Sequence, residues 1–191
     1  VITFCILRQK KMSRLEQHYK NTLMKELVEA FNYEDTKQLP YIEKIVVNCG
    51  LKSINFNDKL IYPVLLAMEG LTNQKPKITR SAKDNANLKI RKGMTSGIKV
   101  TLRGTKMFLF LDQLLLTTLP RIDYFEGFSE KSLSKQGNFS LRIENPQDFL
   151  FIESEFEKFQ TLGPIDITIV IKNSSHEESL MLLTGLQVPI I

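Results

Sequence analysis

The sequence predicts an α+β fold with a mainly antiparallel sheet, helices packed on one side of it, and one long basic loop. Short segments in which polar and apolar residues alternate predict strands, and longer segments with apolar residues at three- and four-residue steps predict helices. Strands follow one another without regular β–α–β alternation, which favours antiparallel pairing. The chain has 191 residues, 42% of them hydrophobic, and is therefore large enough to bury one core.

The first predicted element is a helix of about five turns. Ser13 and Glu16 have the spacing of a capping box, and apolar residues recur behind them at helical steps as far as Phe31. Residues 1–12 precede this cap and are interpreted as an N-terminal extension, bound elsewhere or left from a longer precursor. Residues 13–191 are then expected to form a single domain.

The next elements are a strand and a second helix. Pro40 stops helical structure, so residues 42–48 are predicted to form a strand. A helix is predicted within residues 57–71, and its true start should lie just before Pro63, which is tolerated only in a first turn. Gly70 and the Asn-Gln-Lys-Pro turn behind it are expected to end this helix, before a further strand.

Two long segments without clear periodicity, residues 80–93 and 121–138, are predicted to be loops. Between them, residues 98–102 alternate as a strand and a strongly apolar helix ends at Pro120. Further strands are expected at 139–143 and 165–171, and a last helix should begin at the Ser175–Glu178 capping box and end at Gly185. Three carboxylates are expected on a solvated strand or loop: Glu153, Glu155 and Glu157.

The positive charge is local. The formal net charge is +5, but residues 75–106 hold ten Lys or Arg against one acid, leaving 16 basic and 20 acidic residues elsewhere. A single positive segment on an otherwise slightly acidic chain indicates a polyanion bound at one place, although a merely solvated surface is the alternative. Ten cations within this segment, with three glycines that permit close approach of another backbone, favour nucleic acid as the bound polyanion. No aromatic residues interleave the charges, so recognition of backbone and shape is expected.

The alternative function is a small enzyme acting on nucleic acid or a phosphorylated substrate, and little supports it. Cys5 and Cys49 are too few for a zinc site, and His18 and His176 are expected to be surface residues. Residues 93–99 have the wrong spacing for a phosphate loop and precede a strand. We therefore expect no metal, no cofactor and no catalytic group. No apolar run is long enough to cross a bilayer, so no membrane partner is expected.

The basic segment resembles a known family. NQKPKITRSAKDNANLKIRKGMTSGIKVTLRG is similar to the most recognisable stretch of the large-subunit ribosomal protein L-five family. YIEKIVVNCG, LPRIDYFEGFSEKSLSKQGNFSLRI and IDITIVI resemble other blocks of that family in the same order. The similarity extends from about Ser13 to Leu186, nearly the whole chain.

The resemblance implies a structural component of the large ribosomal subunit with an antiparallel sheet and helices on one side. The implied partners are 5S rRNA and large-subunit rRNA in the central protuberance, P-site tRNA, a small-subunit head protein across an intersubunit bridge, and neighbouring large-subunit proteins. The implied rRNA-binding residues are Asn48, Gln74, Lys75, Lys99, Thr101 and Arg103. The implied tRNA-facing loop carries Arg80, Lys83, Lys89, Arg91 and Lys92. The implied bridge to the small subunit carries Arg121, Asp123, Lys131 and Lys135.

Two features depart from the family pattern. Residues 49–52 replace a more glycine-rich turn, and residues 1–12 have no counterpart. The extension and the alanine-poor composition favour an organellar ribosome. We expect the mitochondrial matrix, with the plastid stroma and the bacterial cytoplasm as alternatives.

Overall fold

The computed structural model describes residues 12–33, 35–51, 61–84, 86–87, 90–160 and 162–191. Five strands form one sheet in the order β2-β3-β1-β5-β4, and every neighbouring pair is antiparallel. The strands are β1 (Tyr41–Gly50), β2 (Lys77–Arg80), β3 (Thr95–Leu102), β4 (Phe139–Ile143) and β5 (Ile165–Lys172). The predicted α+β fold with an antiparallel sheet is confirmed. The predicted extension, except for Met12, lies outside the described residues.

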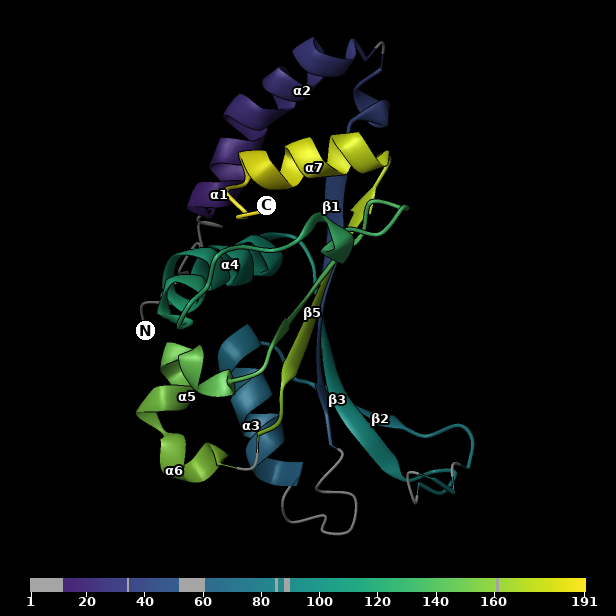
Figure 1. The fold of residues 1–191 in the computed structure, drawn as a ribbon, viewed down its shortest axis with the longest axis vertical. Coiled ribbons are helices and arrows are strands. Elements are labelled where there is room, and N and C mark those ends of the chain that lie inside the picture. The colour runs from purple at the N-terminus through teal and green to yellow at the C-terminus, as the bar shows by residue number, and fades with distance from the viewer. Residues whose placement is uncertain (1–11, 34, 52–60, 85, 88–89, 161) are drawn as a thin grey trace, which may run out of the picture.

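One face of the sheet is the core. In β3 the buried side chains are Ile98, Val100 and Leu102, while Lys99 is exposed and Thr101 is half-buried, as the alternation predicts. β4 and β5 follow the same period of two. Figure 1 shows the sheet nearly edge-on, with α1, α3, α4, α5 and α6 on one side of it. The opposite face carries the polar side chains and is left open by these helices.

The N-terminal helix has the predicted length. It runs as α1 (Arg14–His18), a π-helical stretch (Tyr19–Leu23) and α2 (Met24–Phe31). The Ser13 hydroxyl accepts a hydrogen bond from the Glu16 backbone N–H at 3.2 Å, while the Glu16 carboxylate accepts one from Lys20 at 2.9 Å. The serine therefore caps the helix as expected, and the glutamate forms an i,i+4 pair.

Helix α3 (Ile61–Thr72) has Pro63 in its first turn, as predicted, while residues 57–60 of the predicted range lie outside the described residues. Gly70 does not end it, contrary to expectation. A Cβ at Gly70 would lie 2.1 Å from Cε1 of the Phe151 ring, so the glycine makes room for that ring within the helix. The helix ends at Thr72, where the predicted Asn-Gln-Lys-Pro turn begins: Asn73 has a φ of 50° and donates its N–H to the Glu69 carbonyl at 2.8 Å.

The acidic segment is helical rather than a strand or loop. It forms α5 (Leu150–Ser154) and α6 (Phe156–Phe159), and both helices pack on α3. Ile152 of α5 and Phe159 of α6 are both buried in the core, although the two helices are separated at Glu155. Glu153, Glu155 and Glu157 are exposed, as expected. The alternation of Phe and Glu in the sequence is misleading here, because packing against α3 favours two short helices over a strand.

The remaining helices lie largely where the sequence predicts them. α4 (Thr105–Gln113) continues through a π-helical stretch (Leu114–Thr118) and a 3₁₀ turn (Leu119–Arg121) that contains Pro120. Further 3₁₀ turns lie at Thr36–Gln38, Glu130–Ser132 and Pro146–Asp148. α7 (His176–Gly185) begins with the predicted capping box of Ser175 and Glu178.

Two side chains join the N-terminal helix to α7. Tyr33 donates its hydroxyl to the Glu178 carboxylate at 2.5 Å, and His18 Nε2 lies 3.2 Å from the Gly185 carbonyl oxygen. His18 is therefore a half-buried contact between helices and not the plain surface residue expected from the sequence, whereas His176 is exposed. The sequence does not reveal this contact because 167 residues separate the two partners.

Glu178 should make the stability of the fold depend on pH. Burial acts to raise the pKa of Glu178, but the hydrogen bonds from Tyr33 and Ser175 outweigh it, so the pKa lies below its ordinary value of 4.5. A lowered carboxyl pKa stabilises the fold above the unfolded pKa, and that contribution is lost as the pH falls through the folded pKa. We expect Glu178→Gln, which preserves the capping geometry, to flatten the acid side of the stability profile. Urea unfolding at several pH values below neutral would measure this, with Glu177→Gln as the control.

Candidate nucleic-acid interface

The pairing of the strands lines up one row of polar residues across the open face. The register places Asn48 of β1 opposite Lys99 of β3 and opposite Asp166 of β5. The row continues to both edges of the sheet because Lys99 faces Lys77 of β2 and Asp166 faces Arg142 of β4. Five strands therefore contribute three cations, one amide and one carboxylate to a single line.

A neutral row follows two residues further along the strands. It consists of Thr101, Val46, Thr168 and Ser140. The Ser140 hydroxyl donates to the Thr168 hydroxyl at 3.4 Å. These short side chains offer hydroxyl groups without charge, so this strip suits sugar and phosphate oxygens that approach the sheet closely.

A third group of charges lies beyond the neutral row. A bulge in β1 between Ile42 and Lys44 turns Glu43 to the open face. Arg103 donates to one Glu43 carboxylate oxygen at 3.0 Å, and Lys172 Nζ lies 3.5 Å from the other. The Arg103 hydrogen bond, with Lys172 and Lys44 nearby, outweighs desolvation and holds the Glu43 pKa below its ordinary value. Glu43 therefore stays ionised and orients two cations.

At the other end of the face, the strands present two glycines. Gly50 and Gly97 are paired across β1 and β3. A Cβ at Gly97 would lie 2.9 Å from the Cys49 carbonyl oxygen, whereas one at Gly50 would meet nothing within 4 Å. Gly97 is thus required by the neighbouring strand. Together the pair leaves a strip without side chains beside the charged row, where another backbone could approach.

The structure brings most of the predicted rRNA-binding residues together. Asn48, Lys99, Thr101 and Arg103 share the open face. Gln74 lies at its border, where its amide donates to the Thr101 carbonyl at 3.0 Å and extends the sheet edge before β2 begins. Lys75 is exposed in the connection to β2. Contact of these residues with RNA stays a prediction.

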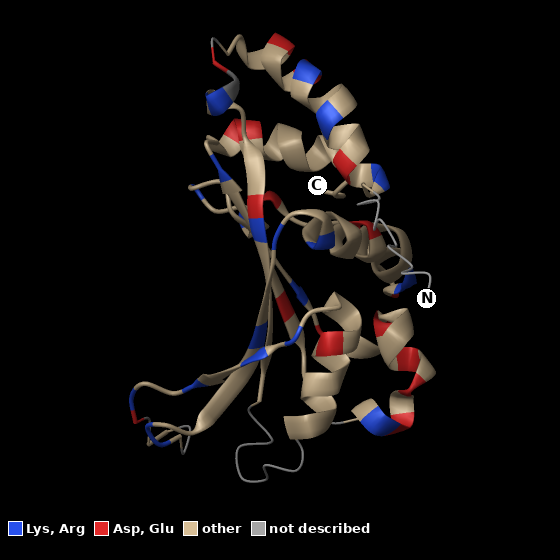
Figure 2. Ribbon diagram, turned by 180° about the vertical axis from the view of Figure 1, so that it is seen from behind, with Lys and Arg blue, Asp and Glu red and all other residues tan. Residues whose placement is uncertain are grey.

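The predicted tRNA-facing loop is the tip of the β2–β3 hairpin. Ser81 continues the pairing beyond β2, because its N–H donates to the Met94 carbonyl and its own carbonyl accepts from Gly93, both at 2.9 Å. Asp84 accepts from the Lys92 backbone N–H at 2.7 Å, so the only acid of the segment shapes the backbone. The predicted cations that the structure describes are all exposed: Arg80, Lys83, Arg91 and Lys92. Lys89 lies outside the described residues. In Figure 2 the hairpin extends away from the helices with blue cations along it.

The predicted bridge residues do not form one cluster. Arg121 forms an ion pair with Glu153 of α5, and Asp123 is exposed beside it. Lys131 and Lys135 are exposed around the turn that leads into β4. The segment is held from behind, because the Phe128 N–H donates to the Pro189 carbonyl and the Ile191 N–H donates to the Phe128 carbonyl, each at 2.8 Å.

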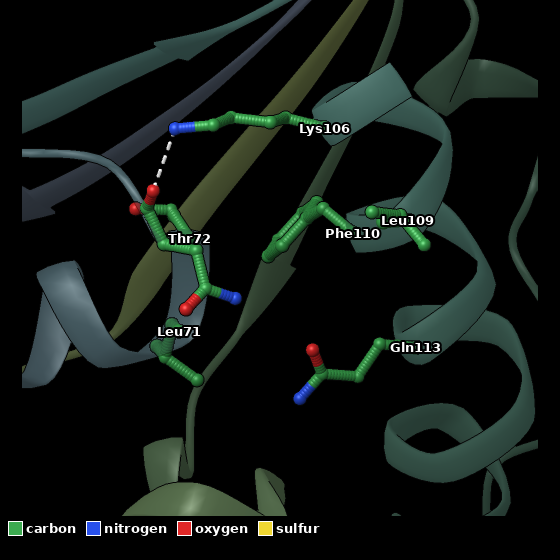
Figure 3. Close-up of a pocket in the computed structure, with 7 residues that line it drawn as sticks. Leu71, Thr72, Lys106, Leu109, Phe110 and Gln113 are labelled. Atoms are coloured by element: carbon green, nitrogen blue, oxygen red, sulfur yellow. Dashed lines mark hydrogen bonds between the residues drawn. The ribbon is translucent and has the colours of Figure 1, made fainter. Parts of the chain in front are cut away.

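A hollow of about 240 Å³ lies between this segment and the end of β4, lined by Ile122, Phe125, Phe128, Arg142, Ile143, Glu144, Asn145 and Asp148. Burial, followed by repulsion from Asp123, raises the pKa of Asp148. A second hollow of about 50 Å³ separates α3 from α4, where Lys106 donates to the Asn73 carbonyl at 2.7 Å (Figure 3). Both are smaller than the roughly 300–1,000 Å³ of small-molecule sites.

Metal ligands and the thiol of Cys49 bear on the alternative of an enzyme. The residues that the structure describes include no group of three potential metal ligands. Burial raises the pKa of Cys49 to about 11, so this thiol stays protonated near neutral pH and is a poor nucleophile. Among the helices that the structure describes, none has the length and apolar character needed to cross a membrane.

Sequence reasoning missed several residues of the open face. The additional members are Glu43, Lys44, Lys77, Arg142, Asp166 and Lys172. Alternation within residues 139–143 and 165–171 already indicates that Arg142 and Asp166 point away from the core. The residues that lie beside Arg142 and Asp166 on the open face are set by the strand register, which the sequence does not reveal.

Comparison with known proteins identifies the family of the chain and agrees with the α+β fold. Residues 36–91 match the family described as Ribosomal protein L5, and residues 95–190 match the family described as the C-terminus of that ribosomal protein. The large ribosomal subunit protein uL5m of Reclinomonas americana is 37% identical over 94% of this chain and 98% of its own length. The uL5 protein of Halothermothrix orenii is 40% identical over 93% of this chain and 98% of its own length. The uL5 protein of Lacticaseibacillus casei is 38% identical over 93% of this chain and 97% of its own length. The chain therefore belongs to the ribosomal protein L5 family, and it is a structural constituent of the large ribosomal subunit rather than an enzyme.

Proposed function

We propose that this protein binds 5S rRNA, or its organellar equivalent, through the open face of its sheet in the central protuberance of the large subunit. The observation that carries the proposal is the gathering of cations from all five strands on that face: Lys44, Lys77, Lys99, Arg142 and Lys172, with Arg103 at the end of β3. Cations in one plane can neutralise successive phosphates and release counterions. The hydroxyl row between them suits contacts that fix orientation.

The distribution of charge supports one orientation on the RNA. In Figure 2 acids gather on α5 and α6, while cations line the hairpin and the strands. Such a dipolar arrangement steers the sheet face toward a polyanion and the α5–α6 side away from it. Large-subunit rRNA and neighbouring large-subunit proteins complete the expected surroundings.

The β2–β3 hairpin is the proposed contact with P-site tRNA. Its tip projects beyond the sheet and carries exposed cations for which the structure shows no ion pair among the described residues. Contacts of such cations with phosphates are independent of sequence, as a site that serves every tRNA requires.

The segment from Arg121 to Lys135 is the proposed bridge to a small-subunit head protein. It is exposed on one side and anchored behind through Phe128. Arg121 pairs with Glu153, the one acid of α5, which holds the start of the segment against that helix. We also propose that residues 13–191 act as one domain, since strands from both matched segments share one sheet. A mitochondrial ribosome remains the preferred location, supported by the alanine-poor composition and the mitochondrial relative.

A variant of the hairpin tip separates the proposed contacts. We expect simultaneous replacement of Arg80, Lys83, Arg91 and Lys92 by alanine to leave 5S rRNA binding and entry into the large subunit nearly unchanged. Retention of tRNA on the assembled ribosome should weaken, because four cations no longer reach the tRNA phosphates. Co-sedimentation of the protein with large subunits and a tRNA dissociation assay would measure the two effects. Failure of the wild-type chain to sediment with large subunits contradicts the main proposal, and failure of the variant alone makes the hairpin an assembly element.

A further inference from the structure

We infer that Asp166, on strand β5 of the open face, is a specificity-determining residue that accepts a hydrogen bond from a donor group of the bound RNA and excludes phosphate from that place. The inference rests on the proposed binding of RNA by this face. It adds which chemical group is recognised there, and it concerns a residue outside the predicted binding set.

The position of Asp166 is unusual for a carboxylate. It stands between Asn48 and Arg142 in the row that crosses all five strands, with cations at both ends of that row. Its side chain is 44% exposed. A negative charge at such a place weakens binding of a polyanion. A surface that bound RNA through charge attraction alone would therefore bind more tightly without this carboxylate.

The ion pair with Arg142 is too weak to explain why a carboxylate stands at position 166. Only one carboxylate oxygen takes part, at 3.6 Å from the Arg142 nitrogen, and both side chains are about half exposed. Exposed pairs of this kind contribute little to stability. Within the described part of the chain, the second Asp166 oxygen accepts no hydrogen bond. Glu43 differs, because each of its oxygens meets a cation and its side chain is only 19% exposed.

The surroundings favour a close approach of RNA to this carboxylate. Gly50 and Gly97 leave space beside Asn48 and Lys99, the next two positions of the row, and Thr168 and Ser140 on the other side of Asp166 and Arg142 are short. Asn48 lies directly opposite Asp166, and its amide makes no hydrogen bond with any residue that the structure describes. Asn48 and Asp166 therefore present unused polar groups between Lys99 and Arg142.

The carboxylate of Asp166 and the amide of Asn48 decide which chemical groups of the RNA can bind between Lys99 and Arg142. A carboxylate accepts hydrogen bonds and repels phosphate, so phosphates belong at Lys99 and Arg142 and an O–H or N–H donor belongs at Asp166. RNA offers such donors as the ribose 2′-hydroxyl and as amino groups on base edges. DNA of the same sequence lacks the 2′-hydroxyl. A carboxylate here thus favours RNA or particular bases while it lowers affinity for other polyanions.

Two matched variants test the inference by equilibrium binding to a 5S rRNA transcript and to DNA of the same sequence. Asp166→Ala removes the acceptor and one negative charge, whereas Glu29→Gln removes one negative charge from the exposed surface of α2. We expect Asp166→Ala to weaken RNA binding by about tenfold, the scale of a charged hydrogen bond. DNA binding should be unchanged or stronger if the donor is a ribose 2′-hydroxyl, and should weaken as well if the donor is a base amino group. Equal strengthening of RNA and DNA binding in both variants would overturn the inference. Asp166→Val, which has no acceptor and a side chain that suits a strand, repeats the test if the alanine variant unfolds.

Modified RNA distinguishes the two sources of the donor. If Asp166 meets a ribose, one 2′-deoxy substitution in the transcript should abolish the difference between wild type and Asp166→Ala. If it meets a guanine amino group, replacement of that base by inosine should do so instead. Additivity of every substitution with Asp166→Ala overturns the inference. Loss of RNA binding by the wild-type chain would instead contradict the proposed function.

Discussion

Lys99→Glu should weaken binding of 5S rRNA by roughly 10- to 100-fold at moderate salt, because it replaces a charge-assisted contact with repulsion at the middle of the cationic row. Lys99 is exposed and lies between Lys77 and Asn48, so the change alters the open face without disturbing the core. The dependence of log affinity on log salt should also become less steep, by about 0.7–0.9 for each phosphate that the protein no longer neutralises. Filter binding over a range of salt concentrations would measure both quantities.

The matched control for Lys99→Glu is Lys158→Glu on α6, which changes the net charge equally on the helical side of the sheet (Figure 1). Lys158 is exposed and pairs only with its neighbour Glu155 at 3.2 Å, so the fold should tolerate the change. We expect a small decrease in affinity from long-range charge alone. An equal decrease in the two variants would mean that RNA senses the total charge of the protein and does not bind at the open face.

Phe139→Ala should lower the free energy of unfolding by about 3–5 kcal/mol, the cost of removing a large buried ring and leaving a cavity. Phe139 is fully buried on the inner face of β4, and its ring meets the Phe128 ring edge to face at a centroid distance of 5.4 Å. Phe128 in turn anchors the proposed bridge segment to the C-terminal residues. The variant should therefore also loosen that segment. Urea unfolding and hydrogen exchange would measure the two effects.

Leu150→Ala serves as the comparison for Phe139→Ala. Leu150 lies at the start of α5 and its side chain is 55% exposed, so its truncation should change the free energy of unfolding by only about 0.5 kcal/mol. Similar losses of stability in the two variants, or a loss below about 1 kcal/mol for Phe139→Ala, would contradict the role assigned to the aromatic contact. Such a result would also remove the proposed support for the bridge segment.

The sequence alone determined the features that are set by neighbours along the chain. Alternation within β3 predicted the exposure of Lys99 and the burial of Ile98 and Val100, because the direction of a side chain in a strand is fixed by a period of two. The cap at Ser175 and the position of Pro63 followed from the hydrogen-bonding needs of a helix start. The clustering of charge is likewise a property of the sequence itself.

Only the tertiary structure decided which polar residues face the proposed RNA together. Lys99 and Asp166 are 67 residues apart, yet both are paired with Asn48, because the register of β1 against β3 and β5 is fixed by packing of the shared apolar face. The bulge that turns Glu43 toward Arg103 also depends on that packing. The two short helices at Glu153 and Glu157 form because burial of Ile152 and Phe159 against α3 outweighs a local pattern that favours a strand. The alternation of residues in the sequence predicts the direction of a side chain, whereas long-range packing determines which residues lie next to it.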